Sequence, residues 1–154
     1  MAATVLLDDV IEALDIVFDE MSSFLDLDTG KVETVSNDLL SEAEESPDDE
    51  PGLSDWQKEE WEIAKRIAST DRFKQLPTKF DVHEWQILQD FSRSVQSERI
   101  REDLQGAIHR AGAFRNFKNL VIQHGIESEW YAFRAAALRQ IAIDWCEENQ
   151  IAWR

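Results

Sequence analysis

The sequence predicts an α+β fold that is mostly helical, with a small antiparallel sheet and about six helices. Three observations support this prediction. The 154 residues are 43% apolar and 10% aromatic, which suffices for the core of a single domain spanning residues 1–154. Residues 24–35 alternate in polarity as strands do, whereas residues 81–149 carry apolar side chains at helical spacing. We expect the four C-terminal helices to form a bundle-like layer.

The N-terminal elements predict an acidic helix followed by a sheet. Residues 5–21 place apolar side chains on one helical face and acids on the other, with Asp8 as the N-cap. Residues 24–35 predict a β-hairpin in which Gly30 supplies the positive φ of the turn. The alternating residues 72–76 predict a third strand that pairs with this hairpin, because a lone hairpin is marginal in water.

The middle of the chain predicts a linker and then a helix. Residues 36–53 contain seven acids and no base, with two prolines and a glycine, which is typical of a solvated, mobile linker. Ser54 and Gln57 then form a capping box for a helix that ends near Thr70. The expected buried stripe of this helix is Trp56, Ile63 and Ile67.

The C-terminal half is expected to be wholly helical. Asp81 and Glu84 form a second capping box, and Ser97 caps the following helix. Two more helices are expected over residues 113–123 and 128–149. Their inward residues, and those of the two helices before them, are expected to include Trp85, Leu88, Phe91, Val95, Ile100, Leu104, Ala107, Ile108, Phe114, Phe117, Val121, Trp130, Phe133, Leu138 and Trp145.

Charge is distributed unevenly. The formal net charge is −16, and residues 1–60 hold 19 acids against two bases, whereas residues 61–154 hold 13 acids and 14 bases. The excess argues against binding of double-stranded DNA by the surface as a whole, because phosphates would be repelled. The C-terminal half can still present a basic face.

Cysteine content and hydropathy bear on the compartment. Cys146 is the single cysteine, so disulfide frameworks and multi-thiolate zinc sites are excluded, and a cytoplasmic location is expected. No apolar stretch approaches the roughly 20 residues that span a bilayer. None of the three histidines sits in a motif with metal-ligand spacing, and we predict no metal, no cofactor and no catalytic residue.

Asp26 and Asp28 partly match two functional motifs, and a plain hairpin is the alternative to both. Asp26 and Asp28 have the spacing of an aspartyl-phosphatase nucleophile and its general acid, but Gly30 stands where a threonine is expected and the βαβ alternation is absent. The same acids lack the turn glycine of a calcium loop at the required position. We therefore expect a polar hairpin with its acids on the solvent face.

A basic notch is the first candidate surface. Arg110 precedes a helix N-terminus, and backbone N–H groups there can hold an anion. The ligand-binding residues predicted for a phosphorylated or nucleic-acid ligand are His109, Arg110, Arg115, Lys118 and Arg134. The alternative is that Phe114 and Phe117 belong to the core while the arginines pair with nearby acids.

The acidic N-terminal region is the second candidate surface and the preferred one. The residues expected to contact a partner protein are Glu44, Glu45, Asp48, Asp49, Glu50 and Trp153. Trp153 is the last residue but one of the sequence, and we expect that it either serves a partner or folds back onto the protein. The leading hypothesis is a soluble cytoplasmic protein-interaction module. The alternative is a binding protein or enzyme that recognises a phosphorylated or nucleic-acid ligand at the basic notch of residues 109–118.

Five segments in order resemble one known family. They are Leu25–Gly30, Trp56–Ala64, Arg72–Phe80, Gly112–Lys118 and Trp130–Trp145. The run Gly-Ala-Phe-Arg followed by Trp-Tyr-Ala-Phe-Arg is the most specific part. Together they resemble the bacterial uncharacterised protein family numbered 0158 in the UPF series, over residues 5–151. The resemblance implies that the whole chain is one unit, and it implies no activity, cofactor or catalytic residue.

Overall fold

The computed structural model describes residues 3–15, 20–48 and 50–154, and within them the chain forms eight helical segments and three strands. The predicted class, mostly helical α+β with a small antiparallel sheet, is confirmed. The chain divides into unit 1, which comprises Met1–Lys79 and Ala142–Arg154, and unit 2, which comprises Phe80–Ile141. Because of this division, folding as a single domain stays a prediction.

The sheet of unit 1 has the strand order β2-β1-β3. β1 (Met21–Asp26) pairs antiparallel with β2 (Val32–Ser36) and with β3 (Phe73–Gln75), so the predicted hairpin and third strand are confirmed. Gly30 in the turn has φ of 76°, and a Cβ there would lie 2.4 Å from a backbone carbonyl oxygen. Met21 was predicted to end a helix, which is wrong because β1 begins there.

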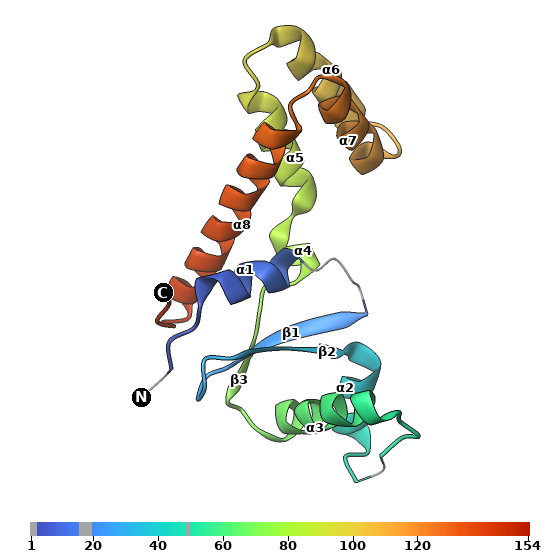
Figure 1. Cartoon of the computed structure of the whole chain (residues 1–154), viewed down its shortest axis with the longest axis vertical. Helices are drawn as coiled ribbons and strands as arrows, with labels where there is room; N and C mark the ends of the chain where they lie inside the picture. Colours follow the sequence, from blue (N-terminus) through green and yellow to red (C-terminus); the bar gives the residue numbers. More distant parts are fainter. Residues whose placement is uncertain (1–2, 16–19, 49) are drawn as a thin grey trace. The chain divides into compact units, whose positions relative to one another are not determined.

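Helix α1 (Leu7–Asp15) packs its buried residues Leu7, Val10 and Leu14 on one side of the sheet, opposite α2 and α3 (Figure 1). It begins at Leu7, so Asp8 lies in its first turn and is not the N-cap. The part of the predicted helix at residues 16–19 lies outside the described residues. The chain ends pair: Val5 forms a parallel bridge with Trp153.

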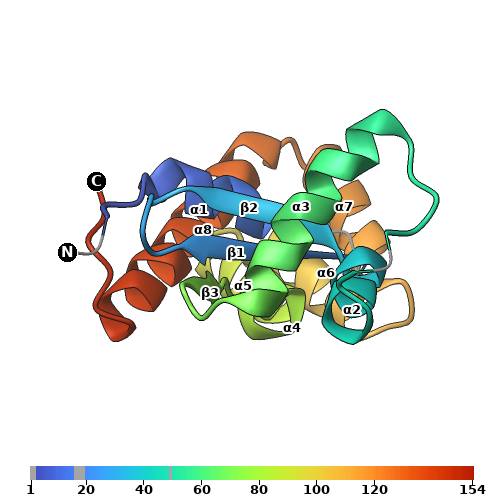
Figure 2. The same cartoon turned by 90° about the horizontal axis from the view of Figure 1, so that it is seen from below.

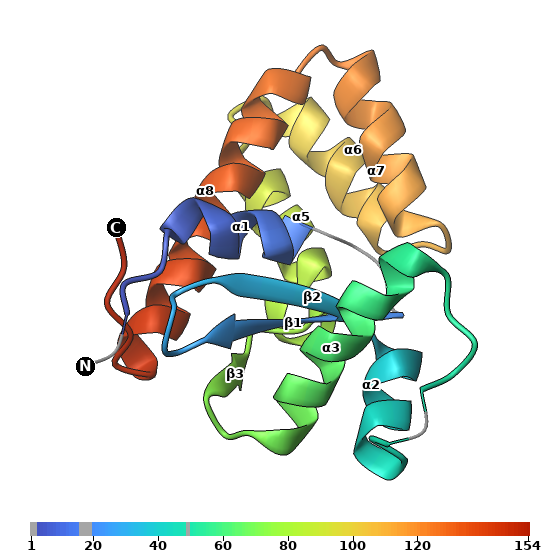
Figure 3. The same cartoon turned by 60° about the horizontal axis from the view of Figure 1, so that its bottom comes forward.

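Residues 36–53 are not a linker throughout, which corrects our prediction. Asn37–Glu45 form helix α2, capped by Ser36, whose side chain accepts a hydrogen bond from the N–H of Leu39. Leu39 and Ala43 are buried against Trp61 and Ala64 of helix α3 (Asp55–Ser69). Figure 3 shows the two helices side by side. The apolar pair Leu39 and Ala43 and the cap Ser36 are enough to hold this short helix, because α3 supplies the apolar partner that an isolated helix would lack.

Helix α3 crosses the outer face of β1 and β2 (Figure 2). Its predicted capping box is present, and it ends at the C-cap Thr70 as expected. The predicted stripe is wrong: Trp56 is 71% exposed, whereas Trp61 and Ala64 are buried. Trp61 lies about 140° around the helix from Trp56 at 100° per residue. Two apolar stripes of α3 have helical spacing, and the buried stripe is the one that faces α2 and the sheet.

Unit 2 consists of helices packed around an aromatic cluster. They are α5 (Glu84–Ser94), α6 (Glu98–Ile108), α7 (Ala113–Gln123) and the first two thirds of α8 (Glu127–Glu148). Ring-to-ring contacts join α5, α7 and α8 through Phe91, Phe117, Trp130 and Phe133, with centroids 4.8–6.0 Å apart. Each such buried ring removes about 150–250 Å² from water.

Local details of unit 2 confirm some boundaries and correct others. Ser97 caps α6 and α7 has the predicted limits. The short helix α4 (Lys79–Val82) is separated from α5 by His83 at φ of 52°, so the predicted capping box of Asp81 and Glu84 is wrong. Phe114 is 52% exposed, which contradicts its expected place inside. In the described part of the chain no helix is long and apolar enough to cross a bilayer.

Candidate functional site

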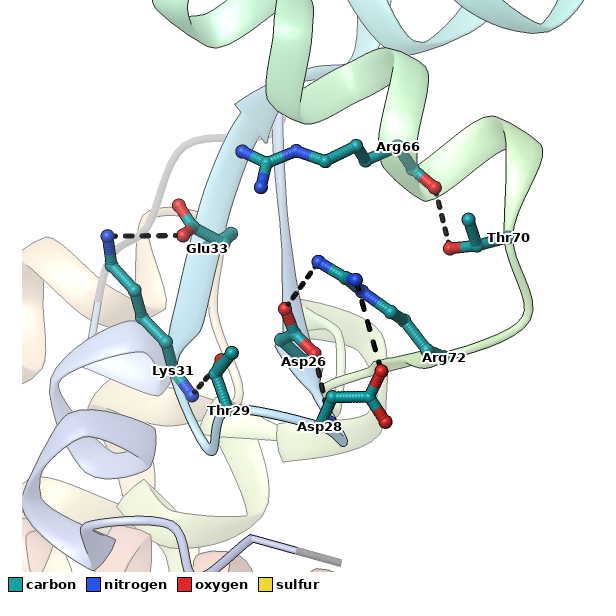
Figure 4. A network of polar contacts seen from close by, with 8 residues as sticks. All are labelled: Asp26, Asp28, Thr29, Lys31, Glu33, Arg66, Thr70 and Arg72. Carbon is teal, nitrogen blue, oxygen red and sulfur yellow. Dashed lines mark hydrogen bonds and ion pairs between the residues drawn. The ribbon is translucent and has the colours of Figure 1, made fainter.

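A polar network closes the end of β1 (Figure 4). The Asp26 side chain is only 7% exposed and accepts two hydrogen bonds, from the backbone N–H of Asp28 at 2.9 Å and from Nη2 of Arg72 at 3.0 Å. Nη1 of Arg72 lies 3.9 Å from a carboxylate oxygen of Asp28. The guanidinium carbon also lies 5.2 Å from the ring centroid of Phe73, within cation–π range. The network ties the hairpin to β3.

This geometry does not support a nucleophilic role for Asp26. Both of its carboxylate oxygens are engaged, by a cation and by a backbone donor, whereas a nucleophile needs a free oxygen facing substrate. The expectation that the hairpin acids lie on the solvent face is therefore wrong for Asp26, and Asp28 alone is exposed. Burial of Asp26 is possible because Arg72 pairs with it.

No metal site is assembled within residues 3–15, 20–48 and 50–154, where no group of three or more potential His, Cys, Asp or Glu ligands gathers. Each histidine near the predicted notch has a local partner. Nδ1 of His109 lies 2.7 Å from the carbonyl oxygen of Gln105, and its ring packs edge-on to Trp85. Nε2 of His124 lies 3.3 Å from a carboxylate oxygen of Asp103.

Cys146 is fully buried. Burial raises the pKa of its thiol, and the neighbouring Glu147 carboxylate raises it further. A thiol held in its neutral form is a poor nucleophile.

The predicted basic notch is not gathered into one cavity. Nε of Arg134 is 2.6 Å from Oε1 of Glu84, an ion pair between α8 and α5. Arg110 lines a hollow of about 510 Å³ between α6 and α7, together with the acids Glu102 and Asp103. Of the five residues predicted to bind an anion, Arg110 is the member that lines this hollow, which also carries two carboxylates. Anion binding there stays a prediction.

Arg115 and Lys118 lie on the outer face of α7, away from the aromatic cluster. Both side chains are exposed, and in the described part of the chain neither forms an ion pair. Phe114 and Ile122 are exposed on the same helix, at 52% and 51%. The expectation that both phenylalanines of α7 belong to the core holds for Phe117 only.

The acidic surface of unit 1 is formed by α2 and the loop after it. We use this name for the exposed residues Asp38, Glu42, Glu44, Glu45, Asp48 and Glu50. The predicted partner residue Asp49 lies outside the described residues. None of the six named carboxylates is in an ion pair with another described residue. Their like charges repel one another, and a basic partner would relieve this repulsion.

Trp56 stands where the acidic loop enters α3, two residues after the N-cap Ser54. It is the most exposed of the large apolar side chains in the described residues. Trp153 behaves differently, since it is half-buried and its backbone pairs with Val5, which is the folded-back arrangement. Of these two tryptophans, Trp56 is the exposed one, although its helical spacing predicts a place in the core.

Comparisons with known proteins give one family. The sequence pattern described as an uncharacterised protein family (UPF0158) matches residues 2–154. A curated protein of the same description from Pseudomonas aeruginosa is 30% identical over 66 residues. That match covers 42% of this chain and 43% of the relative, so the aligned part spans less than half of the relative's length. No solved structure matches.

Proposed function

The chain belongs to the uncharacterised protein family UPF0158, and we propose that it is a protein-interaction module that binds a basic protein through its acidic surface. Trp56 would be the anchor of this contact. The observation that carries the proposal is a tryptophan 71% exposed beside a run of unpaired carboxylates. So exposed a side chain adds little buried area to the isolated chain, whereas buried tryptophans dominate the energetics of interfaces.

The charge layout supports a basic partner. Residues 38–50 contain seven acids and no base, and the six that are described all face solvent. Complementary charge accelerates encounter and selects against acidic partners, while the anchor residue supplies most of the affinity. Helix α2 holds four of these carboxylates on a structured element, packed against Trp61 through Leu39 and Ala43. The surface is thus carried by a helix with its own buried face.

The test compares capture of binding partners by four full-length proteins. These are the wild type, Trp56→Ala, the double variant Glu44→Lys and Glu45→Lys, and the control Tyr131→Ala, which removes an aromatic that is 50% exposed in unit 2. We expect wild type and control to retain the same basic proteins from native cytosol after nuclease treatment. Capture should fall at least tenfold in the other two variants, because loss of an anchor costs about 2 kcal/mol or more.

Equal capture by all four proteins would refute the proposal. Circular dichroism of each variant checks the fold, which should be unchanged because every substituted side chain is exposed. Addition of salt should release the captured proteins, since exposed charges interact over about 8 Å at physiological ionic strength. Partners that disappear with nuclease would instead support the anion-binding hypothesis for Arg110 and its neighbours.

A further inference from the structure

The outer face of α7 carries an apolar stripe with basic residues within it. Phe114, Lys118 and Ile122 follow at i, i+4 and i+8, which places them in one row along the helix. Arg115 lies beside this row. Phe114 and Ile122 are both about half exposed, whereas Phe117 and Val121, which lie on the adjoining face of the helix, are buried. The Phe117 ring lies 4.8 Å from that of Trp130, so the helix is anchored and its outer row is presented on a fixed element.

The electrostatics of this face are opposite to those of unit 1. Residues 104–126 contain no acid and three bases. Unit 1 holds 24 of the 32 acids and 8 of the 16 bases, a net charge of −16, whereas unit 2 holds 8 of each and is neutral. The α7 face is therefore a basic, apolar surface in a strongly acidic protein, and it is complementary to a ligand with carboxylates around a large apolar group.

The mixture of side chains favours a protein ligand over a nucleic acid. Nucleic-acid surfaces combine many cations with several stacking aromatics, but α7 offers two cations, one exposed aromatic, Phe114, and the aliphatic Ile122. An aliphatic side chain has no aromatic ring that could stack on a base, but it packs well against apolar side chains of a protein. The chemistry that fits is an acidic protein surface with an exposed aromatic or aliphatic residue.

The chain itself carries such a surface, namely the acidic surface with Trp56. We infer that the acidic surface of one copy docks on the α7 face of a second copy. This inference rests on the proposed function and names a partner for that same site: a second copy whose α7 face is basic although the whole chain is acidic. Two α7 faces would bring cations against cations, and two acidic surfaces would bring carboxylates against carboxylates. The contact therefore joins two different patches, as in a heterologous, head-to-tail interface.

The large net charge limits this association without preventing it. Two copies at −16 repel each other at long range, but charges beyond about 8 Å are screened at physiological ionic strength. The contact then depends on the local carboxylates, on Arg115 and Lys118, and on burial of Trp56 between Phe114 and Ile122. Contacts of this kind are small and reversible, so the mass should rise with protein concentration.

Sedimentation velocity of the full chain, from about 10 to about 500 μM, tests the inference. The wild type and the control Tyr131→Ala should associate increasingly with concentration. Trp56→Ala and the double variant Phe114→Ala, Ile122→Ala should each be monomeric alone, with association weakened at least tenfold. A one-to-one mixture of these two variants should form a dimer, because each retains the face that the other has lost.

Other outcomes overturn the inference. A wild type that is monomeric throughout excludes the contact, and a mixture that stays monomeric excludes a heterologous one. Loss of self-association in Trp56→Ala but not in Phe114→Ala, Ile122→Ala or in Lys118→Glu would place the contact elsewhere than α7. If the wild type is monomeric yet Trp56→Ala still loses captured basic proteins, this inference fails while the proposed function stands. Circular dichroism confirms that each variant is folded.

Discussion

Breaking the ion pair between Asp26 and Arg72 should destabilise unit 1 measurably. The change Asp26→Asn keeps the size of the side chain and its acceptor for the N–H of Asp28, but it removes the negative charge. Arg72, one third exposed, then keeps its charge without the closest counterion. Hydrogen bonds to charged groups contribute about 1.5–3 kcal/mol, and breaking a fully buried pair costs about 3–5 kcal/mol.

The expected loss is about 2 kcal/mol, at the lower end of these ranges. Water still reaches part of the Arg72 guanidinium, and Asp28 at 3.9 Å compensates for some of the lost attraction. The assay is urea unfolding followed by far-ultraviolet circular dichroism. With an m value of about 2 kcal/mol/M, a loss of 2 kcal/mol lowers the midpoint by about 1 M. If the two units unfold separately, the shift should be confined to one transition.

A double-mutant cycle separates the pair from other effects of each substitution. Asp26→Asn and Arg72→Gln should each destabilise the protein, and the double variant should lose about 1 kcal/mol less than the sum of the two single losses. Losses below about 0.5 kcal/mol for Asp26→Asn, with additive single effects, would refute the reasoning. The carboxylate would then be replaceable, and the network of Figure 4 would not hold β3 to the hairpin.

Three further predictions address the core, the turn and the thiol. Trp61→Ala should cost about 3–5 kcal/mol in unfolding free energy, whereas Trp56→Ala should change it by less than about 0.5 kcal/mol; equal effects would contradict the observed burial. Gly30→Ala should destabilise the protein more than Gly125→Ala. Both glycines have a positive φ, which costs an alanine about 1 kcal/mol, but a Cβ at Gly125 meets no atom within 4 Å. Equal losses on thermal unfolding would show that the clash expected at Gly30 is relieved. Cys146 should react with a thiol reagent only when the protein unfolds. Because the pKa of its thiol is raised in the folded state, the stability that it contributes should fall above about pH 8.5. Cys146→Ala should lack this fall of stability with pH.

The candidate surfaces were predictable to different degrees. The run of acids at residues 38–50 is visible in the sequence, and their exposure follows because carboxylates are seldom buried without a partner. Trp56 and Phe114 were assigned to the core because each has helical spacing with buried residues. A helix offers several apolar stripes, however, and spacing does not say which one a neighbouring element covers. The absence of acids from residues 104–126 is the sequence signal that could have pointed to α7.

By itself the sequence determined the local structure wherever a short-range interaction decides it. The capping residues Ser54 and Ser97, the positive φ of Gly30 and the limits of α7 all depend on side chains within a few residues. Only the tertiary structure decided which groups meet across long separations. Asp26 is buried because Arg72, 46 residues later and just before β3, returns beside it. Residues 37–45 are helical because Trp61 covers Leu39 and Ala43. Burial free energy depends on what covers a side chain, and that partner is absent from any local window of sequence.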